Sequence, residues 1–119
     1  MIEFQAFSDS IGTKLPNVPT LKPGSLTAGQ TETSKVLWSS PGDQFQVGIW
    51  ECSVGKFPST RPDMSEVCHV LTGRVEIEDE DGEKRLLKAG DTFVLARGWQ
   101  GHWNVLEPLR KLYIFNREA

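Results

Sequence analysis

The stretch that decides the fold covers residues 66–95 and reads EVCHVLTGRVEIEDEDGEKRLLKAGDTFVL. Polar and apolar residues alternate through Val75–Glu78, which is the period of a strand with one buried face. The first apolar run ends at Thr72-Gly73, and Asp81-Gly82 lies between two later runs, where such a pair predicts a β-hairpin with positive φ angles in its turn. The stretch therefore predicts four short strands, at residues 66–71, 75–78, 85–87 and 92–95.

The same pattern continues on both sides of this stretch. A short apolar run, 36–38, ends at Pro41-Gly42-Asp43, and further strand-like runs cover 44–52, 102–106 and 109–115. Turn signals recur about every 8–12 residues, which is typical of a β-sandwich or barrel, and no long window has the period of an amphipathic helix. The sequence predicts an all-β protein.

The beginning of the chain differs from this pattern. Residues 1–34 are rich in Pro, Gly, Ser and Thr and keep neither a helical nor a strand period. A chain of 119 residues corresponds to one domain. We therefore expect an irregular N-terminal arm over 1–34, packed on the body or on a partner subunit, and a single β-barrel domain over 35–119.

Composition excludes several classes of function. The net charge is −3 and the sequence pI is about 5.4, so the chain lacks the basic surface of a nucleic-acid-binding protein. It has no apolar run of the ~20 residues that cross a bilayer, and its first residues lack the features of a signal peptide. We expect a cytoplasmic protein, in which Cys52 and Cys68 are reduced, buried thiols.

Two motifs give the chain a family resemblance over residues 48–116. Glu66 and Gly73, with six residues between them, come after Gly55, and the pair Gly90-Asp91 is followed by Gly98. These residues resemble the two motifs of the cupin superfamily, which implies an RmlC-like jelly-roll barrel, also called a double-stranded β-helix. A narrower resemblance, to small cupins related to ureidoglycine aminohydrolase, is carried by residues 48–52, 66–73, 89–94, 98–103 and 106–113.

The cupin resemblance implies a divalent metal held by three histidines and one glutamate. Only the glutamate, Glu66, is present. The slots for the first two histidines hold Ser59 and Arg61, or Thr60 and Pro62 in the longer spacing, and the last slot holds Gly101. We therefore expect no cofactor, with a divalent transition metal as the alternative.

Two histidines and an acidic run leave metal alternatives open. Alternation along the strands places His69 and His102 on the outer face, opposite to Glu66. A β-bulge near Gly98–Gly101 would turn His102 inward and make it a weak candidate ligand. The acidic run 78–81 is expected to be a solvated hairpin tip, and a calcium site is the alternative.

The inner face of the barrel supplies the candidate site. Alternation groups Cys68 and Trp103 with Glu66, which is the best candidate for a catalytic residue. A buried carboxylate needs a partner, and we expect Arg61 or Lys111 to pair with it, either in a structural ion pair or around an acid with a shifted pKa that acts as acid or base. Which faces of the strands around Trp50 and Lys111 point inward stays open. The candidate ligand-binding residues are Trp50, Arg61, Glu66, Cys68, Trp103, Lys111 and Tyr113.

Three functions remain open at this point. The first is a metal-free barrel that binds a small polar metabolite, with Glu66 as the anchor. The second is an enzyme similar to ureidoglycine aminohydrolase that acts on a small ureide or carboxylate. The third is a structural or interaction module. Whichever function applies, we expect a homodimer formed through the N-terminal arm or the sheet edges.

Overall fold

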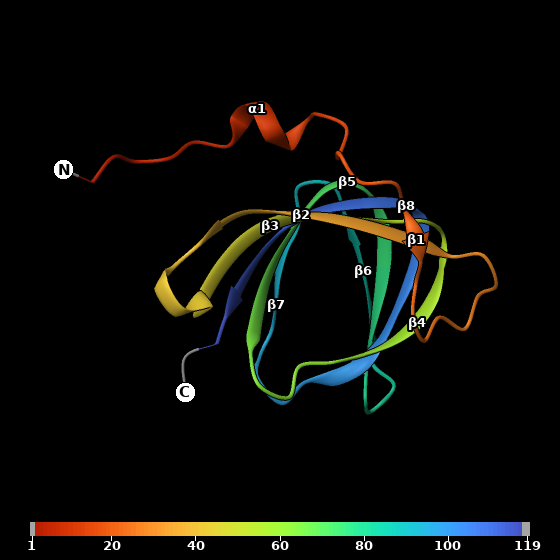
Figure 1. Cartoon of the computed structure of the whole chain (residues 1–119). Helices are drawn as coiled ribbons and strands as arrows, with labels where there is room; N and C mark the ends of the chain where they lie inside the picture. Colours follow the sequence, from red (N-terminus) through yellow and green to blue (C-terminus); the bar gives the residue numbers. More distant parts are fainter. Residues whose placement is uncertain (1, 118–119) are drawn as a thin grey trace.

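The computed structural model describes residues 2–117 and shows a β-barrel with a segment that extends from it at the N-terminus (Figure 1). Within this range the strands pair antiparallel in one eight-stranded sheet that folds over a common core. The chain is an all-β jelly-roll barrel, as the sequence predicted. The strands are β1 (Thr20–Leu21), β2 (Thr31–Ser39), β3 (Phe45–Cys52), β4 (Gly55–Thr60), β5 (Ser65–Asp79), β6 (Lys84–Lys88), β7 (Thr92–Leu95) and β8 (Gln100–Asn116).

Two long strands, β5 and β8, hold the barrel together. They pair with each other along almost their whole length, and the register shifts where β5 passes from Val70 to Val75. On one side of this irregular stretch the pair is flanked by β7 and β3, and on the other by β6 and β4. Because bulges bend strands and increase their twist, one pair of strands contributes to both halves of the barrel.

The two long strands are where the sequence prediction was wrong. We expected β5 to end at Thr72-Gly73 and β8 to break near Glu107–Pro108, but both strands continue through these positions. Pro108 pairs with no partner residue in the register, so its missing N–H interrupts no ladder there. The turn-like residues mark bends within continuous strands.

The hairpin at Asp81-Gly82 is confirmed, with a longer turn than expected. Gly82 has φ 90°, whereas Asp81 does not have a positive φ. The N–H of Gly82 donates to the Asp79 carbonyl at 2.9 Å, and the Asp79 N–H donates to the Glu83 carbonyl at 2.8 Å. A turn whose last loop residue alone is left-handed is typical of a three-residue hairpin loop with a bulge.

The core lies between the two halves of the barrel and follows the predicted alternation. Glu66, Cys68 and Val70 are fully buried on the inner face of β5, and Trp103 and Val105 are buried on β8. Both cysteines are free and buried in the described part of the chain, as expected.

The N-terminal segment contains more regular structure than the expected arm over 1–34. It holds a one-turn helix α1 (Ser8–Ile11), the short strand β1, and the first residues of β2. Leu15 is buried, whereas Ile2 and Phe4 are almost fully exposed on the part that extends away from the barrel (Figure 1). No helix within residues 2–117 combines the length and the apolar character needed to span a membrane.

Candidate functional site

The candidate site is built around Glu66, which lies on β5 opposite Leu95 of β7 and Phe115 of β8. Its side chain is 0% exposed. The Arg61 guanidinium donates to Oε1 of Glu66 through Nε at 3.0 Å and Nη2 at 2.5 Å. The Lys111 ammonium donates to Oε2 at 2.7 Å. Both partners that the sequence suggested therefore bind the same carboxylate, one at each oxygen.

The backbone holds Arg61 in this position. Arg61 follows the last residue of β4, and its N–H donates to the Trp99 carbonyl at 2.8 Å while its own carbonyl accepts from the Gly98 N–H at 2.6 Å. Its Nη1 donates to the Ser59 hydroxyl and to the Thr60 carbonyl, each at 2.7 Å. The guanidinium is thus oriented by contacts other than the ion pair.

The cations determine the charge state of Glu66. Burial opposes the charged form of this carboxyl, but the ion pairs with Lys111 and Arg61 outweigh that cost and hold its pKa below the usual range. Glu66 is therefore an ionised carboxylate. Of the two roles that the sequence left open, the geometry favours the ion pair over an acid with a raised pKa.

A cavity of about 210 Å³ opens beside this charge cluster. Trp50, Phe57 and Trp103 contribute its aromatic walls, and their rings pack against one another with centroids 5.6–6.1 Å apart. The lining residues are Lys22, Ser34, Trp50, Phe57, Pro58, Ser59, Arg61, Glu66, Trp103, Lys111, Tyr113 and Phe115.

Lys111 is the cation at the centre of this arrangement. Its side chain is 6% exposed, and its Nζ lies 4.6 Å from the ring centroid of Trp50 and 4.3 Å from that of Trp103. A cation over aromatic faces is stabilised by the ring quadrupoles. Trp50, Lys111 and Tyr113 all line the cavity. Their faces of β3 and β8 therefore point inward, which the sequence had left open.

Six of the seven predicted ligand-binding residues line the cavity, and Cys68 does not. Its sulfur lies 3.9 Å from Nζ of Lys111, behind the charge cluster. Burial raises the pKa of the Cys68 thiol to about 12, so the group stays protonated. Six lining residues were not predicted from the sequence: Lys22, Ser34, Phe57, Pro58, Ser59 and Phe115. Of these, Phe57 comes from β4, and Lys22 comes from the segment expected to be an arm.

The residues at the cupin metal-ligand slots do not fit a metal ion. Arg61 occupies a histidine slot and brings a positive charge to the carboxylate that a metal would need. A Cβ atom on Gly101 would collide with the Glu78 carbonyl oxygen, so the last slot has no room for a side chain. Imidazole and carboxylate ligands would be required there for a transition metal, and a single carboxylate already bound by two cations cannot supply them.

The two histidines lie outside the cavity. His69 Nδ1 is 2.8 Å from the Thr92 hydroxyl on the outer face, and His102 Nδ1 lies 3.8 Å from a carboxylate oxygen of Glu78. The suggested bulge that would turn His102 inward is not found, because β4 and β8 pair in continuous register through Gly101. His102 is therefore not a ligand at the Glu66 site.

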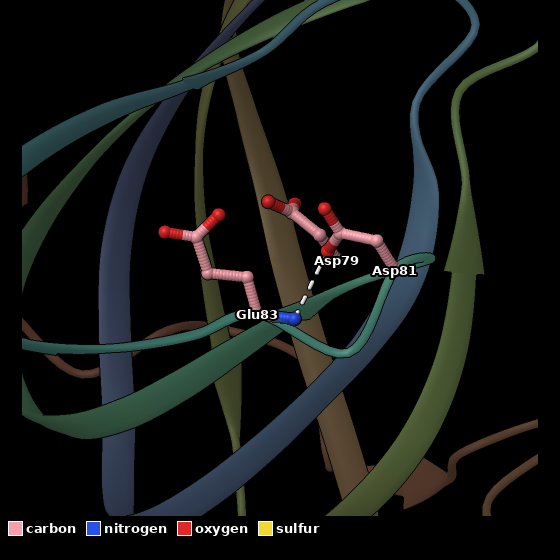
Figure 2. A group of neighbouring side chains, drawn as sticks. All are labelled: Asp79, Asp81 and Glu83. Carbon is pink, nitrogen blue, oxygen red and sulfur yellow. Dashed lines mark hydrogen bonds between the residues drawn. The ribbon is translucent and has the colours of Figure 1, made fainter.

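One further acidic group occurs among residues 2–117, at the tip of the β5–β6 hairpin. The carboxylates of Asp79, Asp81 and Glu83 lie within 4.8 Å of one another and are exposed (Figure 2). Asp79 Oδ1 accepts from the Trp99 indole N–H at 2.8 Å, and Asp81 Oδ1 accepts from the backbone N–H of Glu83 at 3.0 Å. These contacts account for the cluster as part of a solvated turn.

The comparisons with known proteins agree with the fold. The family model of EutQ-like cupin domains matches residues 39–113. A DUF861 family protein from Thermotoga maritima is 42% identical over 55% of this chain and 73% of its own, with a TM-score of 0.52. No curated protein matches the sequence.

Two more distant structures share the fold over most of the chain. The putative ethanolamine utilization protein Q of Salmonella typhimurium is 24% identical, covers 81% of this chain and 76% of its own, and has a TM-score of 0.65. Ectoine synthase from P. lautus is 16% identical, covers 99% and 80%, and has a TM-score of 0.68. With a family model that matches well over half of its residues, the chain belongs to the EutQ-like cupin domain family.

Proposed function

We propose that this cupin binds a small polar metabolite in the cavity beside Glu66 and that it does so without a metal ion. The observation that carries the proposal is the buried cluster of Arg61, Glu66 and Lys111, which faces a cavity walled by aromatic rings. A concave site in which aromatic walls meet a few convergent polar groups is a usual form of a small-molecule site.

The structure changes the role we assign to Glu66. Both of its oxygens already accept hydrogen bonds from Arg61 and Lys111. The carboxylate therefore positions the two cations, and the side chain that meets the ligand is Lys111. An ammonium has three N–H donors, of which one is used by Glu66.

Calorimetric titration with small metabolites tests this function. The wild-type protein, dialysed against EDTA, is titrated with carboxylates, ureides and amines of low molecular weight. The Lys111→Met variant keeps the length of the side chain and removes its charge, so we expect at least a tenfold loss of affinity for the ligand that binds, equal to about 1.4 kcal/mol. Lys35→Met, an exposed change on β2, is the matched control and leaves affinity unchanged. Binding that is unaffected by Lys111→Met contradicts the proposal.

Catalysis in the same cavity is the alternative, supported by the resemblance of residues 98–103 and 106–113 to cupins related to ureidoglycine aminohydrolase. Such an enzyme would release ammonia from a small ureide. Incubation of the protein with ureides, followed by an ammonia assay with and without added divalent metal, separates this function from binding alone.

A dimer module is the second alternative, and one observation favours it. Ile2 and Phe4 are 101% and 92% exposed on a segment that extends from the barrel. Isolated apolar side chains on an extended arm are suited to a second copy of the chain. Sedimentation of the protein with and without residues 1–30 tests whether the arm holds a dimer together.

A further inference from the structure

We infer that the ligand of this cavity is a small monocarboxylate, whose carboxylate accepts hydrogen bonds from Lys111 and Trp103 and whose apolar part lies against Trp50 and Phe57. The inference rests on the proposed binding function and adds the chemical class of the ligand. It follows from the charge of the lining, from its unused hydrogen-bond donors, and from its size.

The charges that line the cavity leave one positive charge unmatched. Arg61 and Lys111 are cations and Glu66 is the anion between them. The third lining cation, Lys22, has its own partner, because its Nζ lies 3.3 Å from Glu32. A buried excess charge is costly unless it is paired, so a ligand with one negative charge complements the site, whereas a neutral or cationic ligand does not.

Two hydrogen-bond donors beside the cavity are not fully used by acceptors within residues 2–117. The Trp103 ring is 1% exposed, and its Nε1–H has no acceptor within residues 2–117. Lys111 gives one N–H to Glu66 and has a long contact with the Cys68 sulfur, a weak acceptor. Because an unsatisfied buried donor costs about 1–3 kcal/mol, a ligand that brings acceptor oxygens gains the most in this cavity.

The carboxylate and one hydroxyl in the lining already accept hydrogen bonds. Glu66 accepts through both oxygens, and the Ser59 hydroxyl accepts from Arg61. A ligand rich in donors, such as an amine, would therefore find few partners and would meet the charge of Lys111. The polar end of the ligand is expected to be an acceptor.

The size and walls of the cavity favour a small ligand with an apolar part. A volume of about 210 Å³ equals roughly seven water molecules at about 30 Å³ each, and it is smaller than the ~300–1,000 Å³ of sites for drug-sized ligands. Trp50, Phe57 and Trp103 offer apolar surface to a short hydrocarbon chain. Inorganic phosphate, a mixture of mono- and dianion at pH 7, has no apolar part to lie against these walls.

The test is a calorimetric titration of the full chain at pH 7 with four probes: butyrate, butyramide, butylammonium and inorganic phosphate. We expect butyrate to bind at least about tenfold more tightly than butyramide, because its carboxylate carries the charge that pairs with Lys111 and the neutral amide does not. We expect no detectable heat from butylammonium and much weaker binding of phosphate.

A pair of tryptophan variants tests the role of the indole donor. Trp103→Phe removes the Nε1–H and keeps an aromatic ring, so butyrate affinity should fall about five- to tenfold, the value of one hydrogen bond of about 1–1.4 kcal/mol. Trp99→Phe is the matched control, because the Trp99 indole donates to Asp79 outside the cavity, and it should leave affinity unchanged. The thermal unfolding of both variants is measured to show that they fold.

The outcomes separate this inference from the function on which it rests. If neither a probe nor any of the small carboxylates, ureides and amines binds, the proposed binding function is wrong. If butyramide or butylammonium binds as tightly as butyrate, the cavity binds small molecules but the assignment of a carboxylate is overturned. Phosphate that binds as tightly as butyrate overturns the role of the apolar part of the ligand, and equal affinity in Trp103→Phe overturns the role of Trp103.

Discussion

Carboxylates occur in two very different settings in this cupin. Glu66, inside the barrel, is fully buried and is bound by two cations. Asp79, Asp81 and Glu83, at the hairpin tip, are exposed and lie within 4.8 Å of one another (Figure 2). Three neighbouring negative charges are tolerated at the tip without a cation bound to each of them, whereas a single negative charge in the barrel has two.

The carboxylates differ in their need for cations because one setting is exposed to water and the other is buried. Water screens exposed charges, so that exposed pairs contribute only about 0–1 kcal/mol. In a buried site the loss of hydration costs several kcal/mol per ion and must be offset by partners. The number of acidic residues in a cluster is therefore a poor guide to function, whereas burial and pairing point to the site at Glu66.

Removal of the buried carboxylate should have the largest effect on stability. Glu66→Ala leaves Arg61 and Lys111 as unpaired cations in the barrel, so we expect the free energy of unfolding to fall by about 3–5 kcal/mol. Urea denaturation measures the change. A loss below about 1 kcal/mol would show that the cluster is hydrated in solution and that Glu66 does not have the buried role described here.

Acid should weaken the same contact. The pKa of Glu66 is held below its usual range in the folded protein, so this group stabilises the fold above the pKa of the unfolded chain, and that contribution is lost as the pH falls through the folded pKa. The pH dependence of unfolding below about pH 4.5 should therefore be shallower in Glu66→Gln than in wild type. Glu83→Gln at the hairpin tip is the control, and an equal flattening in that variant would contradict the assignment.

The two cysteine thiols are also buried acids, but no cation stabilises their charged form enough to offset burial. Burial raises the pKa of Cys68 to about 12 and that of Cys52 to about 11. Since the thiolate is the reactive form, both thiols should resist a disulfide reagent at pH 8 until the protein is unfolded. Rapid labelling of either cysteine in the native state would show that the barrel opens to solvent more readily than the structure indicates.

Changes at the hairpin tip should have the smallest effect. Glu83→Gln removes one of three exposed like charges, and surface changes of this kind usually stay within about 0.5 kcal/mol. A modest gain in stability fits the relief of repulsion. A loss above about 1 kcal/mol, measured by urea denaturation, would mean that the acidic cluster has a structural role that its contacts do not reveal.

The strand pattern and the partners of Glu66 could be predicted from local chemistry. Alternation placed Cys68 and Trp103 on the inner face with Glu66, and the need to pair a buried carboxylate pointed to Arg61 and Lys111. The first inference needs only the alternation of neighbouring residues in a strand, and the second needs only the cost of burying one charge.

Strand β4 and the cavity residues Phe57 and Lys22 could not be predicted, because they depend on contacts between distant segments. The strand β4 contains Pro58 and few β-forming residues, so its sequence is weakly strand-like, and it forms through pairing with β8. For the same reason Phe57 was missed in the cavity. Lys22 was missed because residues 1–34 were expected to be irregular, whereas β1 pairs with β2 and places this part of the chain beside the barrel.

We propose that a carboxylate with two cations replaces the metal centre of the cupin barrel and leaves a site for a small anion. Calorimetric titration of butyrate into protein dialysed against EDTA, compared with the same protein supplied with zinc or manganese, tests it most directly. If the site needs no metal, butyrate binds with the same affinity in both samples. Binding that requires the added metal, or no binding in either sample, would contradict it.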